Sequence, residues 1–182
     1  MEDFTKVKLI EVPRNIVAGH DALGSIREMC ENVHFGKTGT IITGTKTMDA
    51  AARDVLSYMD GYDIDVVQVG EASIENARIA EDRIREFGSG FILAVGGGSV
   101  IDAAKFIGAG AFYDGDPWDL STGKGKITAC LPIVTVLTLS ATGSEMDAAG
   151  VISNLETKDK IGRIDAHLQP KVSFLDPTNT YT

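Results

Sequence analysis

Residues 94–105 read AVGGGSVIDAAK, and this segment is the most informative one in the sequence. The apolar run 91–95 that leads into it is typical of a buried strand. Three glycines then interrupt the apolar pattern: Gly96, Gly97 and Gly98. Ser99 is a candidate N-cap, because apolar residues follow it at helical spacing. A strand that passes through glycines into a helix presents free N–H groups at the positive helix end, where phosphate binds. A tight turn without a ligand would use the same glycines, which a Cβ would crowd or restrict in φ.

The string GGGSVIDAAK, from Gly96 to Lys105, resembles the pyrophosphate-binding loop of the iron-containing alcohol dehydrogenase superfamily, which includes butanol, glycerol and glycerol-1-phosphate dehydrogenases. Strings after residue 94, such as PIVTVLTLSATGSEM and PKVSFLDPTNTYT, resemble the butanol dehydrogenase branch. The part before it, from VPRNIVAGHDAL to REFGSGFILAV, looks more like glycerol-1-phosphate dehydrogenases. This change of resemblance near Gly96 indicates either a chimera of two homologues or an unusual branch of the family.

Short apolar runs alternate with segments of helical periodicity along the chain. Strands are expected at residues 40–42, 64–69, 91–95 and 131–139. Helices are expected at residues 22–32, 50–59, 75–87 and 99–109. This alternation predicts an α/β fold, a Rossmann-like doubly wound parallel sheet with helices on both faces.

The remaining segments are short. Residues 9–12 and 15–18 are expected to form a small N-terminal β-hairpin around Pro13, and residues 114–118 a loop. Further short strands are expected at residues 151–154 and 172–175. We therefore expect residues 1–182 to form one dinucleotide-binding domain.

Composition narrows the class of protein. The 182 residues are 43% hydrophobic and 24% charged, which fits one globular domain. The formal net charge is −9 and no basic run occurs, so neither nucleic acid nor an anionic membrane is an expected partner. No stretch of about 20 apolar residues predicts a membrane span. The N-terminus has no apolar core of a signal peptide, so a cytoplasmic protein is expected.

Ligands of doubly wound sheets bind at the carboxyl ends of the strands. In this sequence four loops are expected to converge on one crevice, at Gly44, Gly70, Gly96 and Thr138. Hydroxyls after strand 131–139 suit a carboxamide, a ribose or a phosphate, although an ordinary Ser/Thr-rich turn explains the same residues. The resemblance implies that Thr138, Thr142 and Ser144 contact the nicotinamide side of a cofactor.

The first strand of the sheet ends in Gly44, Thr45 and Lys46. An acidic residue at such a strand end would accept hydrogen bonds from the adenine ribose and repel a 2′-phosphate. Thr45 and Lys46 tolerate the phosphate instead, which favours NADP over NAD as the cofactor. A solvated turn lysine is an alternative explanation of Lys46.

Three charged residues complete the predicted site. Asp102 lies early in the phosphate-loop helix, and an inward carboxylate would repel pyrophosphate, so an outward or ribose-facing side chain is expected. Lys105 is either part of the site or an exposed helix lysine. The resemblance implies a cofactor contact for Lys160, whereas its charged surroundings predict a solvated loop residue. The expected cofactor-binding residues are Gly44, Thr45, Lys46, Gly96, Gly97, Gly98, Ser99, Asp102, Thr138, Thr142, Ser144 and Lys160.

No metal site is expected in this sequence. Neither the two cysteines nor the three histidines show metal-ligand spacing: the histidines are His20, His34 and His167. The resemblance implies that an Asp and histidines of a second, helical domain hold Fe or Zn. The sequence stops at Thr182, before those ligands would appear. We expect no catalytic residue here, and an exposed apolar face that would favour self-association.

Three hypotheses follow. The chain is the NAD(P)-binding domain of a metal-dependent alcohol or polyol dehydrogenase, truncated or engineered and inactive alone. Alternatively, it is an oxidoreductase that works only with a partner chain that supplies the metal domain. In the third hypothesis it is a chimeric folding scaffold with a relic cofactor site.

Overall fold

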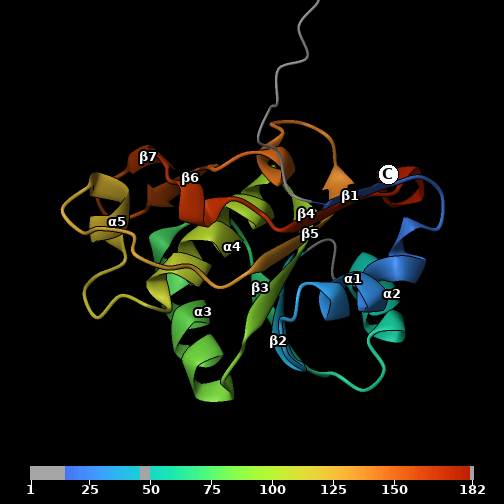
Figure 1. Ribbon diagram of the computed structural model, residues 1–182. Helices are drawn as coiled ribbons and strands as arrows, with labels where there is room; N and C mark the ends of the chain where they lie inside the picture. Colours follow the sequence, from blue (N-terminus) through green and yellow to red (C-terminus); the bar gives the residue numbers. More distant parts are fainter. Residues whose placement is uncertain (1–14, 46–49, 181–182) are drawn as a thin grey trace, which may run out of the picture.

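The computed structural model describes residues 15–45 and 50–180 of the chain (Figure 1). Its centre is a six-stranded sheet in which all neighbouring strands are parallel. In spatial order the strands are β1 (Asn15–Ala18), β8 (Val172–Leu175), β5 (Ile133–Leu139), β4 (Phe91–Gly97), β2 (Thr38–Gly44) and β3 (Asp63–Val69). The predicted α/β fold with a parallel sheet is confirmed.

Helices cover both faces of the sheet, as predicted (Figure 1). The longer helices α3 (Ile74–Phe87) and α4 (Gly98–Gly110) pack on one face. On the other face lie α1 (Ile26–Asn32) and α2 (Ala51–Tyr58). The short helical turns are α5 (Trp118–Thr122), η1 (Ala22–Ser25), η2 (Ser144–Met146), η3 (Ala166–Leu168) and η4 (Pro177–Thr180).

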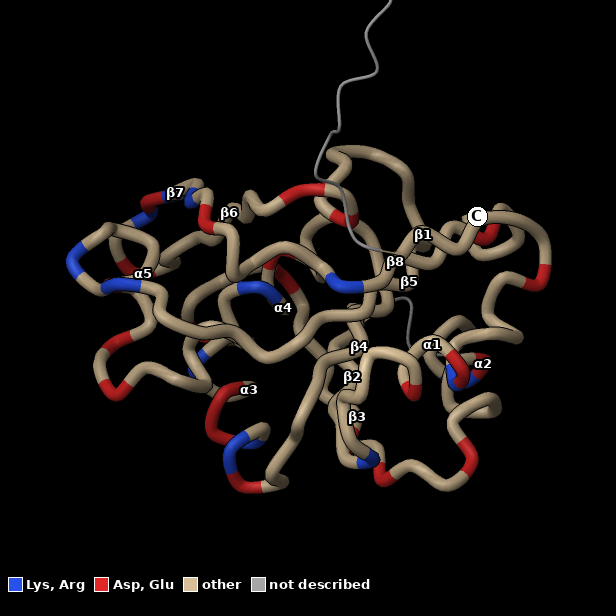
Figure 2. Tube along the Cα trace, viewed as in Figure 1, with Lys and Arg blue, Asp and Glu red and all other residues tan. Residues whose placement is uncertain are grey.

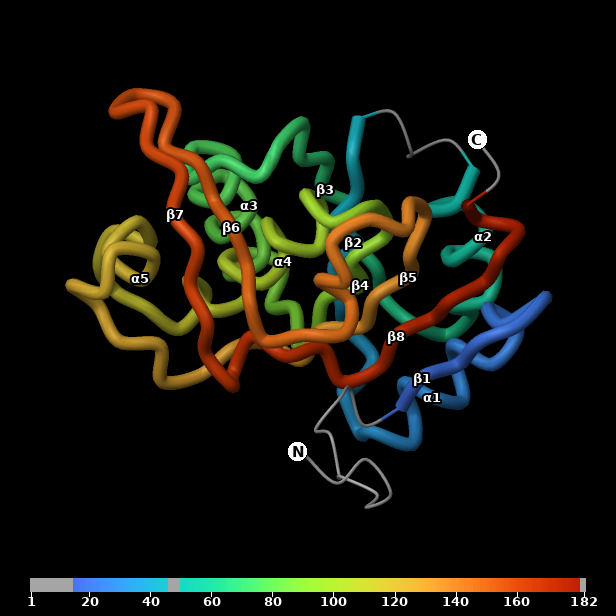
Figure 3. The backbone as a smooth tube through the Cα atoms, turned by 90° about the horizontal axis from the view of Figure 1, so that it is seen from above, coloured from blue at the N-terminus to red at the C-terminus, as the bar shows by residue number. Residues whose placement is uncertain are grey.

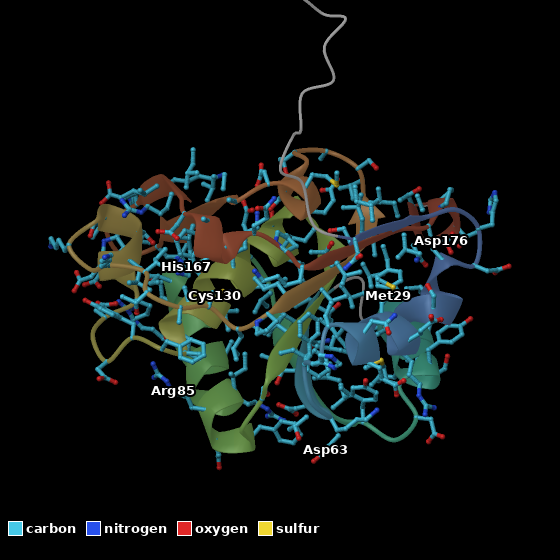
Figure 4. All side chains as sticks on the ribbon, viewed as in Figure 1. Met29, Asp63, Arg85, Cys130, His167 and Asp176 are labelled. Carbon is cyan, nitrogen blue, oxygen red and sulfur yellow. The ribbon has the colours of Figure 1, made fainter. Side chains whose placement is uncertain are left out.

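Each face of the sheet carries its own hydrophobic core. Successive strand residues point to opposite faces, so Ile92 and Ala94 join the α3–α4 core while Leu93 and Val95 join the α1–α2 core. Strands β4 and β5 are nearly continuous apolar runs because both of their faces are covered. Figure 4 shows the two sides: Cys130 and His167 lie toward α5, and Met29 and Asp176 lie toward α1.

The chain reverses its direction across the sheet between β2 and β4. From β2 it passes through α2 to β3 at the edge, and from β4 it passes through α4 to β5 on the other side. The helices that follow β2 and β4 therefore lie on opposite faces. Such a switch point leaves a crevice at the carboxyl ends of the two strands, where ligands bind in open α/β sheets.

A small antiparallel hairpin stands apart from the main sheet. It consists of β6 (Ala149–Asn154) and β7 (Asp159–Ile164), with Ser153 opposite Lys160, and β6 packs on α4. Figure 3 shows the hairpin on the α3–α4 side of the molecule. Only β6 is expected from the sequence. The prediction that Lys160 lies in a loop is wrong, because Lys160 belongs to β7. The sequence does not reveal this strand, because β7 is polar and mostly exposed and has no apolar run.

Three other local features differ from the predictions made from the sequence. Residues 9–12 of the predicted N-terminal hairpin lie outside the described residues, and its second half, β1, pairs in parallel with β8. Ser99 is not the N-cap of α4, because extended backbone continues to Gly97, which takes that position. The predicted loop 114–118 ends where α5 begins.

Charges of both signs are distributed over the surface of the described chain. In Figure 2 acidic and basic segments alternate, and no described element carries a continuous basic run. None of the described helices combines the length and the apolar character that crossing a membrane requires.

Candidate functional site

The glycine loop, Gly96–Gly98, consists of the last residues of β4 and the first residue of α4, so no residue separates the two elements. None of its three glycines has a positive φ, so close packing is the reason for glycine here. A Cβ on Gly96 would lie 2.6 Å from Val100 Cγ2, and one on Gly98 would lie 2.6 Å from Thr142 Oγ1. A Cβ on Gly97 would approach Leu139 Cβ to 3.2 Å. The loop therefore brings α4 directly against the loop that follows β5.

A cavity of about 280 Å³ opens beside this loop. The loops after β3 and β5, the start of α4 and the β6–β7 hairpin contribute to its wall. The lining residues are Glu71, Ala72, Gly98, Ser99, Asp102, Thr142, Val151, Ser153 and Lys160. The N-cap of α4 is a glycine without a side chain to satisfy the first N–H groups. This end of α4 is thus suited to an anion.

Asp102 lies on the cavity wall, one turn into α4. Its Oδ1 accepts a hydrogen bond from Ser144 Oγ at 2.6 Å, and its Oδ2 accepts one from the Val151 N–H at 3.1 Å. Burial raises the pKa of this carboxyl, and both hydrogen bonds oppose the rise. The side chain is fixed toward η2 and β6 by these two hydrogen bonds.

Lys105 is fully buried beneath the cavity. Its Nζ donates to Ser144 O (2.8 Å), Ser144 Oγ (2.9 Å), Asp147 O (3.0 Å) and Asp147 Oδ1 (3.0 Å), and it also contacts Ala149 O. Burial lowers the pKa of this lysine, and the Asp147 carboxylate opposes that effect. The alternative of an exposed helix lysine is therefore wrong. The signal in the sequence is that Lys105 and Asp102 are the two charged residues in an otherwise apolar stretch from Val100 to Ile107.

Five of the twelve predicted residues line the cavity together: Gly98, Ser99, Asp102, Thr142 and Lys160. Thr138 and Ser144 are buried next to it, with 4% and 3% exposure, and Ser144 bonds within the protein. Gly44 and Thr45 lie at the neighbouring end of β2, where Thr45 approaches Gly70. Lys46 lies outside the described residues. The lining residues that the sequence did not single out are Glu71, Ala72, Val151 and Ser153.

A larger surface hollow, about 570 Å³, lies between β3 and α3. The cation that lines it is already engaged, because Arg83 binds the Asp65 carboxylate through two hydrogen bonds of 2.6 and 2.7 Å. No glycine loop or strand end opens into it. We therefore assign the functional site to the smaller cavity at the glycine loop.

Within residues 15–45 and 50–180, no three His, Cys, Asp or Glu side chains gather in a way that could hold a metal ion. All three histidines are exposed. These residues do not fit the metal that the resemblance implies, and no chemical step is derived through one.

Comparisons with known proteins agree with this geometry. The family model described as "Iron-containing alcohol dehydrogenase" matches residues 13–177. The chain is 55% identical over 98 residues to NADH-dependent butanol dehydrogenase A of Clostridium acetobutylicum, which covers 54% of this chain and 25% of that protein. It is 38% identical over 181 residues to the NADPH-dependent aldehyde reductase YqhD of Escherichia coli, covering 95% of this chain and 46% of the reductase.

Glycerol-1-phosphate dehydrogenase of Methanoregula boonei is 36% identical over 104 residues, covering 57% of this chain and 29% of that enzyme. Among solved structures, NADH-dependent butanol dehydrogenase A of Thermotoga maritima superposes with a TM-score of 0.87 at 34% identity, covering 97% of this chain and 46% of that one. The chain thus spans less than half the length of these relatives. Because the family model covers most of the sequence and the folds agree, the chain belongs to the iron-containing alcohol dehydrogenase family.

Proposed function

We propose that this chain binds a nicotinamide dinucleotide, NAD or NADP, in the cavity at the glycine loop. One observation supports this most strongly: Gly98, Ser99, Asp102, Thr142 and Lys160, far apart in the sequence, line one cavity at the switch point of the sheet. The relatives named above are NADH- or NADPH-dependent enzymes. When bound, such a cofactor supplies or accepts a hydride.

In this proposal each element of the cavity has a separate task. The N–H groups of Gly98 and Ser99, at the start of α4, bind the pyrophosphate, because a helix N-terminus favours negative charge. Asp102 accepts hydrogen bonds from ribose hydroxyls with the lone pairs that Ser144 and Val151 leave unused. Thr142, which packs against Gly98, and Lys160, on the β6–β7 hairpin, contact the nicotinamide half.

We further propose a preference for NADP over NAD. Thr45 is exposed at the carboxyl end of β2 and no acidic residue stands at that position. An acidic side chain there would repel a 2′-phosphate, and Thr45 does not. The adjacent Lys46 would strengthen the preference through its positive charge.

Catalysis is assigned in this proposal to the whole protein and not to this chain alone. The named relatives are butanol dehydrogenases and an aldehyde reductase, so a small alcohol or aldehyde is the proposed substrate class. Metal ligands and the remaining wall of the active site would come from residues other than those described, in the same protein or in a partner chain.

The chimera hypothesis is a second proposal with its own observation. A 98-residue match reaches 55% identity with one butanol dehydrogenase, whereas a 104-residue match to a glycerol-1-phosphate dehydrogenase reaches 36%. Uneven similarity of this kind would arise if two homologues were joined. A scaffold built in this way would fold without binding a cofactor.

Calorimetric titration of the purified, folded chain with NADPH and NADH at low salt tests these proposals. Saturable binding supports the cofactor site, and tighter binding of NADPH supports the Thr45 argument. Absence of binding at millimolar cofactor would favour the scaffold. Turnover of a small alcohol after addition of Fe²⁺ or Zn²⁺ would contradict the assignment of catalysis to the whole protein.

A further inference from the structure

We propose that Lys105 is a positioning residue that holds Asp102 in place through Ser144. The inference rests on the proposed function, because Asp102 is the wall residue that would receive the ribose. Lys105 itself has no exposed surface and does not line the cavity. Its effect on a ligand must therefore pass through the residues that it binds.

The lysine organises the segment that carries Ser144. All five acceptors of its ammonium group belong to Ser144, Asp147 and Ala149, in the segment that runs from the start of η2 to the start of β6. Three of them are backbone carbonyls, which a lysine can bind only if the turn folds around it. A buried cation with several oxygen partners acts here as a bound metal ion would, fixing six residues of chain around one point.

The hydrogen bonds also determine where the Ser144 proton points. An ammonium group can only donate, so Ser144 Oγ uses a lone pair to accept from Lys105 at 2.9 Å. The hydroxyl proton is then directed to the other neighbour, Asp102 Oδ1, at 2.6 Å. The direction Lys105 to Ser144 to Asp102 is thus fixed, and it keeps the carboxylate in the role of acceptor.

The positive charge of Lys105 also affects the electrostatics of the cavity. A carboxylate beside a phosphate site repels the ligand unless a positive charge compensates it. Lys105 lies one turn after Asp102 on α4, and its positive charge offsets part of the negative charge of Asp102, although its own ion pair at 3.0 Å is with the Asp147 carboxylate. Asp102 also accepts the Val151 N–H, so both of its oxygens are held while lone pairs remain for a ligand. A phosphate and a hydroxyl donor can then bind side by side.

A double-mutant cycle on NADPH affinity tests the inference, with Lys105→Met and Asp102→Asn measured singly and together. We expect each single change to weaken binding about tenfold, and the double variant to bind no more weakly than Asp102→Asn alone. Losses that multiply to about a hundredfold, or an unchanged affinity in Lys105→Met, would overturn the inference. Lys124→Met, at an exposed lysine away from the cavity, is the matched control for the lost charge.

Ser144→Ala provides a second route if Lys105→Met does not fold. It removes one acceptor and leaves the other four contacts of Lys105 in place. We expect about fivefold weaker binding that disappears in the Asp102→Asn background, and recovery in Ser144→Thr, which keeps the hydroxyl. Equal affinities in wild type and Ser144→Ala would contradict the proposed link.

A readout without cofactor separates this inference from the proposed function. The Val151 N–H donates to Asp102, so its hydrogen exchange reports how firmly the carboxylate is held. Exchange at Val151 is expected to accelerate in Ser144→Ala relative to the other amides of β6. If wild type does not bind NADPH but exchange accelerates, the positioning holds and the cofactor proposal fails. Unchanged exchange would refute the positioning itself.

Discussion

Gly98, at the start of α4, packs so closely against the Thr142 side chain that no room remains for a Cβ. Replacing Gly98 with Ala would place a Cβ 2.6 Å from Thr142 Oγ1, so the threonine must turn and the methyl group fills the phosphate end of the cavity. We expect NADPH affinity to fall at least about tenfold, the equivalent of about 1.4 kcal/mol. Gly24→Ala is the control, because nothing lies within 4 Å of its Cβ position. Equal affinity in the two variants would disprove this role of Gly98.

Glu81 gives the molecule a pH dependence unrelated to the cofactor site. Its carboxyl is buried between α3 and α4 against Gly110, and Oε1 has no hydrogen-bond partner. Burial raises the pKa of Glu81 from 4.5 to about 8. The folded state therefore holds a proton that the unfolded state releases between these values. Stability should decrease through this window, by up to about 1.4 kcal/mol per pH unit, and level off above pH 8.

Glu81→Gln is expected to remove that decrease and to be more stable than wild type at pH 8, with little difference at pH 4.5. Urea unfolding at several pH values measures it. Glu86→Gln makes the same change at an exposed position of α3 and should retain the wild-type slope. If the free energy of unfolding of Glu81→Gln fell with pH as steeply as that of wild type, another group would be responsible for the pH dependence.

Single residues of the site differ in how readily the sequence predicts them. Thr142 stands directly beside Gly143 and Asp102 one turn after the glycine loop, so the loop pattern locates both near a strand end. Lys105 does not stand out in this way, because its acceptors lie 39 to 44 residues later in the chain. Contacts of that separation arise only when α4 and β6 pack together.

At the scale of elements, Ser73 caps the N-terminus of α3. Ser73 Oγ accepts the Asn76 N–H at 3.3 Å, and the helix ends at Gly88, whose φ is 74°. Ser73→Ala should lower the free energy of unfolding by about 1 kcal/mol. Ser57→Ala, at an exposed serine inside α2, should change it by less than about 0.5 kcal/mol. Urea unfolding of both variants tests this prediction. If Ser73→Ala and Ser57→Ala were equally stable, the result would argue against a stabilising cap at Ser73.

Buried strands and amphipathic helices could be predicted because burial on one or both faces leaves a periodic apolar pattern. Strands β4 and β5 show this pattern over their whole length. Strand β7 does not, because it is an exposed strand with a single neighbour, and its pairing with β6 depends on tertiary position. The parallel pairing of β1 with β8 likewise joins residues more than 150 positions apart, which local periodicity does not reveal.

At the scale of the whole molecule, an apolar side chain is exposed at the edge where the candidate site lies. Leu139, at the carboxyl end of β5, is 56% exposed. Leu139 would contribute to the apolar face that the sequence predicts, and a contiguous face of this kind would favour association, so we expect the apparent mass from light scattering to rise with protein concentration. A constant monomer mass at high concentration would exclude self-association through this edge.

The cofactor proposal and the scaffold proposal differ most clearly in the stability of the folded chain. A ligand that binds only the folded state stabilises it by RT ln(1 + [L]/Kd), which is about 2.7 kcal/mol at a hundredfold excess over Kd. For a chain of this size, 1 kcal/mol corresponds to a change in Tm of about 2–4 °C. Saturating NADPH should therefore raise Tm by about 5–10 °C in wild type, and by clearly less at the same concentration in Gly98→Ala. Because this shift depends on the cavity and not on turnover, it needs no metal and no second domain. A cooperative unfolding transition that NADPH and NADH leave unmoved would identify the cavity as a relic site in a folded scaffold.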